Sequence, residues 1–304
     1  MTPSRQSPAA PAALTGVDSS EVDRLLAGDH ADPHHILGAH PATVNGAAGV
    51  IVRAMHPDAA SAEALLACGR AVELARLKGG LFGVFLAGET MPLRYRLRFR
   101  FAGGATWERG DPYRFLPTIG DVDLHLFNEG THRRLWEVLG AHPREIDGER
   151  GVSFAVWAPN ARSASVIGQH ELWDGRLLPM RKLGSSGVFE LFIPDVAPGT
   201  LYKYQLRTHE GIPRVKTDPF AFGMEAPPET ASCVVDLARY SWSDGEWMGG
   251  RPARDHARLP MLIYELHLGS WARNTAEGNR SLTYRELAPA LVEHCKRLGF
   301  TNVE

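Results

Sequence analysis

Hydrophobic and polar residues alternate with a period of two along several short stretches of the chain. Three of these stretches lie in its second third, at residues 152–157, 188–193 and 201–206. Pro-Asn, Asp-Gly and Pro-Gly pairs separate them, and such pairs are typical of turns. Short alternating strands with this punctuation predict a β-sandwich.

The pattern occurs twice in the chain. Residues 37–41 and 139–143 both read LGAHP, 102 positions apart, and further matches follow at an offset that grows to 107. A period of about 100 residues indicates duplicated domains rather than a solenoid. We therefore expect a mainly β protein with two tandem immunoglobulin-like β-sandwich modules, residues 17–117 and residues 118–227.

Two further features belong to the first copy. A short helix is expected ahead of it, because Asp18 can cap such a helix and Gly28 can end it. Residues 94–101 then place four arginines on one face of a strand and apolar residues on the other. We interpret the arginine row as a solvated face, with a contact to a neighbouring domain or a polyol ligand as the alternative.

The last part of the chain has a different pattern. Residues 228–258 lose the alternation and are interpreted as a linker, and residues 261–266 form a compact apolar strand. Thr283 begins a helix with a capping box and Gly299 ends it, after which another strand starts. Strand, helix and strand open a parallel sheet. Because a (β/α)8 barrel needs about 250 residues, we expect residues 259–304 to be the truncated start of one, and the chain to be the front part of a longer protein.

Composition narrows the function classes. The 33 Lys+Arg and 35 Asp+Glu give a net charge of −2, which argues against nucleic acid as the main partner. No apolar run approaches the roughly 18 residues of a membrane span. Cys68, Cys233 and Cys295 are widely spaced and provide no disulfide framework, so a reducing, cytoplasmic location is expected. Residues 1–16 are rich in Pro, Ala and Ser without the apolar core of a signal peptide, and predict a disordered tail.

These motifs resemble those of a known family. VWAPNARSASVIGQHELWDG (156–175) and LYKYQL (201–206) resemble the carbohydrate-binding module that precedes α-amylase-type barrels. YELHLGSW (264–271) and residues 282–304 resemble the first strand and first helix of that barrel in 1,4-α-glucan (glycogen) branching enzymes. DPHHILGAHP (32–41) looks like part of the additional N-terminal module of the bacterial members.

The resemblance implies an enzyme of glycogen biosynthesis. Members of this family cleave an α-1,4 bond and transfer the oligosaccharide to a 6-hydroxyl, which makes an α-1,6 branch. The chemistry is that of retaining glycosidases, with two carboxylates and no cofactor. Those carboxylates lie on later barrel strands, and no position of this sequence matches them. We therefore assign no catalytic residue, expect this chain alone to be inactive, and expect α-1,4-glucan as its partner.

Two residues are the candidate carbohydrate-binding groups. Trp173 lies in the turn ELWDG, where an exposed indole offers a flat apolar face to a sugar ring; in the resembling modules the Trp at this position stacks on α-glucan. Lys203 lies on the strand face opposite Tyr202 and Tyr204 and matches a lysine that reaches sugar hydroxyls. Plain packing of Trp173 and an ordinary exposed lysine are the alternatives. Residues 212–216 contain no aromatic where related modules often have a second one, so a two-ring platform is not expected.

Three further features could belong to a glucan-binding or metal site. Trp271 follows the first barrel strand and is expected to line the glucan cleft. Trp157 alternates with its strand and is interpreted as structural. Four histidines lie close together near the first copy, but their spacing matches no zinc pattern and no metal site is expected. They are His30, His34, His35 and His40.

Two alternative functions remain open. The first is a stand-alone glycogen-binding protein without catalysis, although its strand–helix–strand segment would then expose Leu287, Leu291 and Leu298. The second is the front end of a debranching enzyme or trehalohydrolase. Such proteins share the module but continue differently after residues 264–265, and the motif HLGSW favours the branching enzymes.

Overall fold

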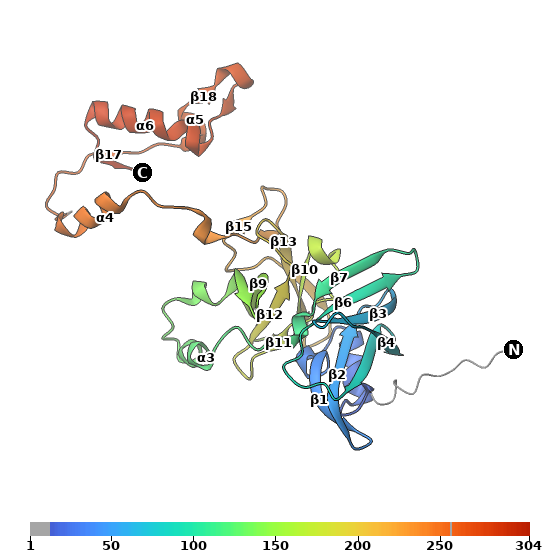
Figure 1. Ribbon diagram of the computed structural model, residues 1–304. Coiled ribbons are helices and arrows are strands. Elements are labelled where there is room, and N and C mark those ends of the chain that lie inside the picture. The colour runs from blue at the N-terminus through green and yellow to red at the C-terminus, as the bar shows by residue number, and fades with distance from the viewer. Residues whose placement is uncertain (1–12, 256) are drawn as a thin grey trace. The chain divides into compact units, whose positions relative to one another are not determined.

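The computed structural model describes residues 13–255 and 257–304 (Figure 1). The chain divides into two compact units, one that ends at Leu237 and one that spans Ala238–Glu304. The short 3-10 helix η5 (Leu237–Arg239) lies at this division. Among the described residues, no helix has both the length and the apolar character needed to cross a membrane.

The first module of the first unit is a β-sandwich whose seven strands follow the order β1-β2-β5-β4-β3-β6-β7. Strand β4 pairs with β5 on one side and with β3 on the other, so it joins the two sheets. Val52, Phe82 and Leu97 from both sheets pack in one core. The elements are α2 (Ser19–Leu26), η1 (Pro33–His35), β1 (Gly38–Val44), β2 (Ala47–Met55), β3 (Ala59–Leu66), β4 (Ala71–Lys78), β5 (Leu81–Ala87), β6 (Tyr95–Phe101), β7 (Thr106–Gly110) and η2 (Pro112–Arg114).

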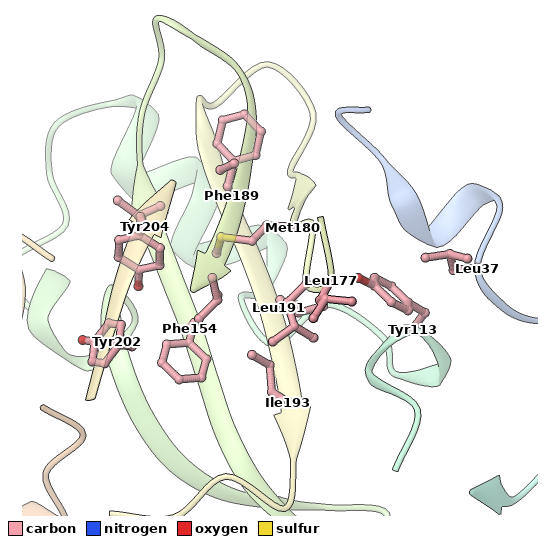
Figure 2. Close-up of a cluster of buried hydrophobic side chains, with 14 of the residues drawn as sticks. Leu37, Tyr113, Phe154, Leu177, Met180, Phe189, Leu191, Ile193, Tyr202 and Tyr204 are labelled. Atoms are coloured by element: carbon pink, nitrogen blue, oxygen red, sulfur yellow. The ribbon is translucent and has the colours of Figure 1, made fainter. Parts of the chain in front are cut away.

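The second module is a β-sandwich of two separate sheets, β11-β12-β9-β8 and β10-β13-β16-β15, with β14 added to β13. Figure 2 shows its core, which contains Phe154, Phe189 and Tyr204. Leu37 and Tyr113 of the first module belong to the same buried cluster. The elements are α3 (Asp121–Asn128), η3 (Leu135–Glu137), β8 (Gly140–Ile146), β9 (Glu149–Trp157), β10 (Ala161–Gly168), η4 (Gln169–Glu171), β11 (Arg181–Lys182), β12 (Val188–Pro194), β13 (Leu201–Thr208), β14 (Pro213–Lys216), β15 (Gly223–Met224) and β16 (Ser232–Cys233).

The predicted mainly β fold class is confirmed, and the duplication is visible in the backbone. Strands β2 and β3 and strands β9 and β10 start and end 102 positions apart, and β3 and β10 carry the same register shift near their first residues. Each first hairpin turns on a pair with left-handed backbone, at residues 45–46 and 147–148. Helix α3, which we did not expect, repeats α2 at the same offset.

One glycine in each module illustrates why the motif LGAHP occurs twice. Gly38 and Gly140 have φ angles of 95° and 99°, a region that favours glycine. A Cβ atom at either position would collide with a backbone oxygen, that of Tyr113 in the first module and that of Phe220 in the second. Close approach of the segment that ends each module therefore requires this glycine.

A buried tyrosine–aspartate pair is also repeated. The Tyr95 hydroxyl donates to Asp111 Oδ2 at 2.5 Å, and the Tyr202 hydroxyl donates to Asp218 Oδ2 at 2.6 Å. Each carboxyl also accepts from the backbone N–H two residues further on, at 3.0 and 2.8 Å. Burial raises the pKa of both carboxyl groups, and the tyrosine hydrogen bonds oppose that shift.

Arg53 connects the N-terminal segment to the first module. Its buried guanidinium donates to the backbone oxygens of Ala13 and Thr15, both at 2.7 Å, and to that of Ile36 at 3.2 Å. Burial lowers the pKa of Arg53 to about 10. A tail was expected over residues 1–16. Residues 1–12 lie outside the described part of the chain, and two of residues 13–16 accept hydrogen bonds from Arg53.

The arginine row on β6 holds ion pairs rather than pointing only into solvent. Arg98 and Arg100 pair with Glu63 of β3 at 3.3 and 3.0 Å. Arg96 donates to Asp195 Oδ2 at 2.8 Å, and Asp195 belongs to the second module. The solvated-face interpretation is therefore incomplete, because at Arg96 the alternative of a contact with a neighbouring domain applies.

The second unit contains the expected strand–helix–strand. Strands β17 and β20 pair in parallel, and Thr283 and Glu286 form the capping box of α6. One face of α6 buries Leu287, Leu291 and Cys295, whereas Leu298, which we grouped with that face, is exposed. The elements are α4 (Gly245–Gly250), η6 (Arg251–Ala253), β17 (Ile263–Tyr264), α5 (Leu268–Trp271), β18 (Arg273–Asn274), η7 (Thr275–Glu277), β19 (Arg280–Ser281), α6 (Tyr284–Leu298) and β20 (Asn302–Val303).

The segment interpreted as a linker, residues 228–258, does not lie entirely outside the modules. Its residues Ser232–Cys233 form β16, which pairs with β13 and β15 of the second module. The linker character therefore begins after β16, close to the division of the two units at Leu237.

Replacing Tyr95 by Phe is expected to lower the free energy of unfolding of the first unit by about 1–3 kcal/mol, because the Asp111 carboxyl stays buried with one donor fewer. Tyr202→Phe is the matched comparison and should cost less, since Asp218 keeps a second hydroxyl donor, Tyr204, at 3.3 Å. Urea denaturation followed by fluorescence measures both. Equal stability of Tyr95→Phe and the unsubstituted chain would contradict this account.

Candidate functional site

A strained turn carries Trp173. The turn follows β10 and contains η4, and both Leu172 and Trp173 have left-handed backbone, with φ angles of 50° and 62°. The backbone N–H of Trp173 donates to the backbone oxygen of Gly168 at 3.0 Å, which closes the turn. Its side chain remains 40% exposed. Left-handed non-glycine residues cost about 1–3 kcal/mol each and gather at functional sites, so this turn is a candidate for function.

Lys203 lies on the neighbouring strand, on the outer face of the sheet. In β13, Tyr202 and Tyr204 are fully buried, so Lys203 between them points away from the core. Lys203 is opposite Ile167 of β10, just before the turn begins, and its Nζ donates to Thr230 Oγ1 at 2.9 Å.

Gln205 connects the turn to this outer face. It is two positions after Lys203 and therefore shares its face. A Cβ atom at Gly175 would contact the Gln205 side-chain amide, so the end of the turn passes directly over Gln205. The structure thus brings Trp173's turn and Lys203 to one face of the second module. Sequence analysis missed Gln205, although the period of two from Lys203 would have identified it.

The edge of this face has no second aromatic ring. Strand β14 pairs with β13 and places Val215 opposite Gln205, with all four β14 residues exposed. Val215 and Gln205 are on the same face because directly opposed residues share one. This face therefore presents an amide, an ammonium and an aliphatic side chain, and the turn above it carries the exposed Trp173.

Comparison with known proteins assigns these segments. Residues 138–221 match carbohydrate-binding module 48 (isoamylase N-terminal domain). Residues 18–113 match the N-terminal domain of the alpha-1,4-glucan branching enzyme GlgB. The 1,4-alpha-glucan branching enzyme GlgB of Myxococcus xanthus is 46% identical over 97% of this chain, and that of Thermobifida fusca is 50% identical over 96%. The chain matches the N-terminal part of GlgB branching enzymes.

This similarity has a defined extent. The chain spans 40% of the length of the Myxococcus xanthus enzyme and 38% of that of the Thermobifida fusca enzyme. A crystal structure of a putative alpha amylase from Salmonella typhimurium shares 25% identity over 55% of this chain and 24% of its own, with a TM-score of 0.37. Trp173 and Lys203 both lie inside the segment that matches the carbohydrate-binding module.

The remaining tryptophan candidates make local contacts. Trp157 donates its ring N–H to the Ser186 oxygen at 3.2 Å and meets the edge of Phe127, yet 52% of it is exposed. Trp271, in the second unit, ends α5 and donates to the Tyr264 hydroxyl at 2.9 Å. The part of Trp271 in lining a glucan cleft remains a prediction.

The histidines of the N-terminal cluster have structural partners. The His40 ring N–H donates to the Leu37 oxygen at 2.9 Å, and His142 makes the same bond to Leu139 in the second module. His34 packs its ring against Tyr113. Within residues 13–255 and 257–304, no group of three or more His, Cys, Asp and Glu side chains is arranged to hold a metal ion.

His170 is a partly buried residue of the turn, and both of its ring nitrogens are buried. Its ring stacks on Phe154, with 6.4 Å between ring centres and 13° between planes. Within the described part of the chain, neither of its ring nitrogens has a hydrogen-bond partner. Burial, with a smaller contribution from the positive charge of Arg109, lowers the pKa of His170 to about 4. The ring is therefore neutral at pH 7.

The depressed pKa of His170 predicts a specific acid sensitivity. Protonation of His170 is harder in the folded state than in the unfolded state. The contribution of the neutral His170 ring to the free energy of unfolding is therefore complete above pH 6.5 and is lost as the pH falls towards 4. Between pH 7 and pH 4 the unsubstituted chain should lose up to about 3 kcal/mol more stability than His170→Phe. Denaturant titrations at each pH measure this difference. The control His209→Gln, at an exposed histidine, should follow the unsubstituted chain; parallel curves for His170→Phe would refute the assignment.

Proposed function

We propose that the first unit binds α-1,4-glucan on the outer face of the second module. The single observation that carries this is the strained, exposed Trp173 turn, whose end lies over Gln205 on the same sheet face as Lys203. The indole offers an apolar face to a sugar ring, and the ammonium and amide donate to sugar hydroxyls. The match of this segment to a carbohydrate-binding module supports the proposal.

We further propose that this unit is the glucan-holding front of a cytoplasmic enzyme that branches glycogen. Its relatives are named 1,4-alpha-glucan branching enzymes. The parallel β17–α6–β20 segment agrees with the start of an α-amylase-type barrel. Three free cysteines agree with a reducing compartment.

Trp173→Ala should weaken the binding of the chain to glycogen. Covering one face of an indole contributes about 1.5–3 kcal/mol, so the dissociation constant should rise roughly ten- to hundredfold. Affinity electrophoresis in gels with graded glycogen concentrations measures it. Trp242→Ala is the matched control, because Trp242 is 77% exposed and lies in the other unit.

Lys203→Met should weaken glycogen binding by a smaller factor, about three- to tenfold, since it removes one hydrogen-bonding group and keeps the aliphatic stem. Unchanged migration of both Trp173→Ala and Lys203→Met, with the unsubstituted chain retarded, would refute the outer face as the site.

The 304-residue chain should not branch amylose by itself, because no position in it matches the family's catalytic carboxylates. Incubation with amylose should leave the absorbance spectrum of the iodine complex unchanged. A shift of the absorbance maximum to shorter wavelength would show that this chain contains catalytic groups and would contradict the proposal.

A further inference from the structure

A cavity of about 510 Å³ lies between the two modules of the first unit. The first module lines it with His56, Asp58 and the Trp107 ring, and the second with His170 and Asp174, together with two leucines. Its volume is within the range of about 300–1,000 Å³ that small-molecule sites have. The residues of the second module come from the same turn that carries Trp173.

The wall from the first module is aromatic and held in place. The His56 ring meets the Trp107 ring edge-on, with 5.7 Å between ring centres. The Arg109 guanidinium lies over Trp107, 4.8 Å from the ring centre. Such a wall suits the apolar face of a ring-shaped ligand.

The polar groups of the cavity include two neutral imidazoles. Burial lowers the pKa of both His56 and His170 to about 4, so each ring has one donor and one acceptor nitrogen at pH 7. The His56 Nδ1 accepts from the Asp58 N–H at 3.3 Å, which leaves its Nε2 as the donor. Within the described residues, both nitrogens of His170 lack partners. Because both His170 nitrogens are closed off from solvent, His56 Nε2 is the imidazole nitrogen that can donate to a ligand hydroxyl, and His170 contributes the shape of the wall.

Two carboxylates lie at the rim and share one arginine. Arg176 pairs with Asp174 at 2.6 Å and lies 3.6 Å from Asp58 of the other module. The Arg176 hydrogen bond lowers the pKa of Asp174, which is therefore ionised. The two carboxylates disfavour an anionic ligand, and Arg176 offsets one of their two negative charges. Ionised carboxylates accept strongly from sugar hydroxyls.

We propose that this cavity is a second carbohydrate site, which takes one or two glucose units at the end of an α-1,4-glucan chain. The choice of glucan rests on the function proposed above; the preference for an uncharged, hydroxyl-rich ring ligand rests on the cavity. One turn then serves two sites: Trp173 belongs to the outer face, and His170 and Asp174 belong to the cavity.

Maltotriose is the probe for this site, added to the full 304-residue chain. In the Trp173→Ala background, the imidazole ¹⁵N resonances of His170 should shift on titration, and calorimetry should still detect binding. Adding His56→Phe, which removes the Nε2 donor and keeps a ring against Trp107, should weaken that binding at least tenfold. Asp58→Trp is a second variant at a side chain that is 69% exposed, and its ring should block the rim without unfolding the module.

The outcomes separate the two proposals. Unshifted His170 resonances, or equal maltotriose affinity with and without His56→Phe in folded protein, overturn the cavity site; the outer face then stands if Trp173→Ala weakens glycogen retardation. Glycogen retardation that is unchanged in Trp173→Ala but is lost in Asp58→Trp and His56→Phe overturns the outer face and supports the cavity. Absence of any binding by the unsubstituted chain overturns both.

Discussion

The arrangement of the first unit depends on a carboxyl group buried inside each β-sandwich. Asp111 and Asp218 lie where the chain leaves their modules, and a core tyrosine hydroxyl holds each of them. A buried carboxyl without such donors is strongly unfavourable, so the chain has little freedom at these points. In the first module this anchor also positions Tyr113, whose hydroxyl donates to the Pro179 oxygen at 3.2 Å. The same constraint that closes the first sandwich therefore brings its end into the core of the second.

Much of this architecture could be predicted because its signals are local. The period-two strands, the offset of 102 growing to 107 and the capping box of Thr283 are all visible in the sequence. Helix α3 was missed because its N-cap residue, Gly120, has no side chain that could cap the helix. The helix also buries no residue. The offset itself would have identified it, since α2 lies 102 positions earlier.

The parts that could not be predicted depend on how the two modules pack together. The pairing of Arg96 with Asp195 joins positions 99 residues apart, and no local pattern indicates it. The cavity requires Trp107 of one module and His170 of the other to meet across a junction. The sequence around His170 gives no indication that its ring nitrogens are buried. The location of Trp173 and Lys203 in one module could be predicted because both belong to local motifs, and their role in binding remains a prediction.

The duplication relates the face proposed to bind glucan in the second module to a docking face of the first module. Lys203 lies 107 positions after Arg96, so the two occupy equivalent places on β13 and β6. Arg96 uses that place to pair with Asp195 of the second module, which commits this part of the first module's face to docking. The offset between the copies is 102 at β3 and β10 and 107 at β5 and β12. The second copy therefore has five more residues between β10 and β12, the stretch that contains the Trp173 turn. The first module therefore uses part of the repeated face to hold its neighbour, whereas the second module carries an inserted turn with the exposed Trp173 next to the equivalent place.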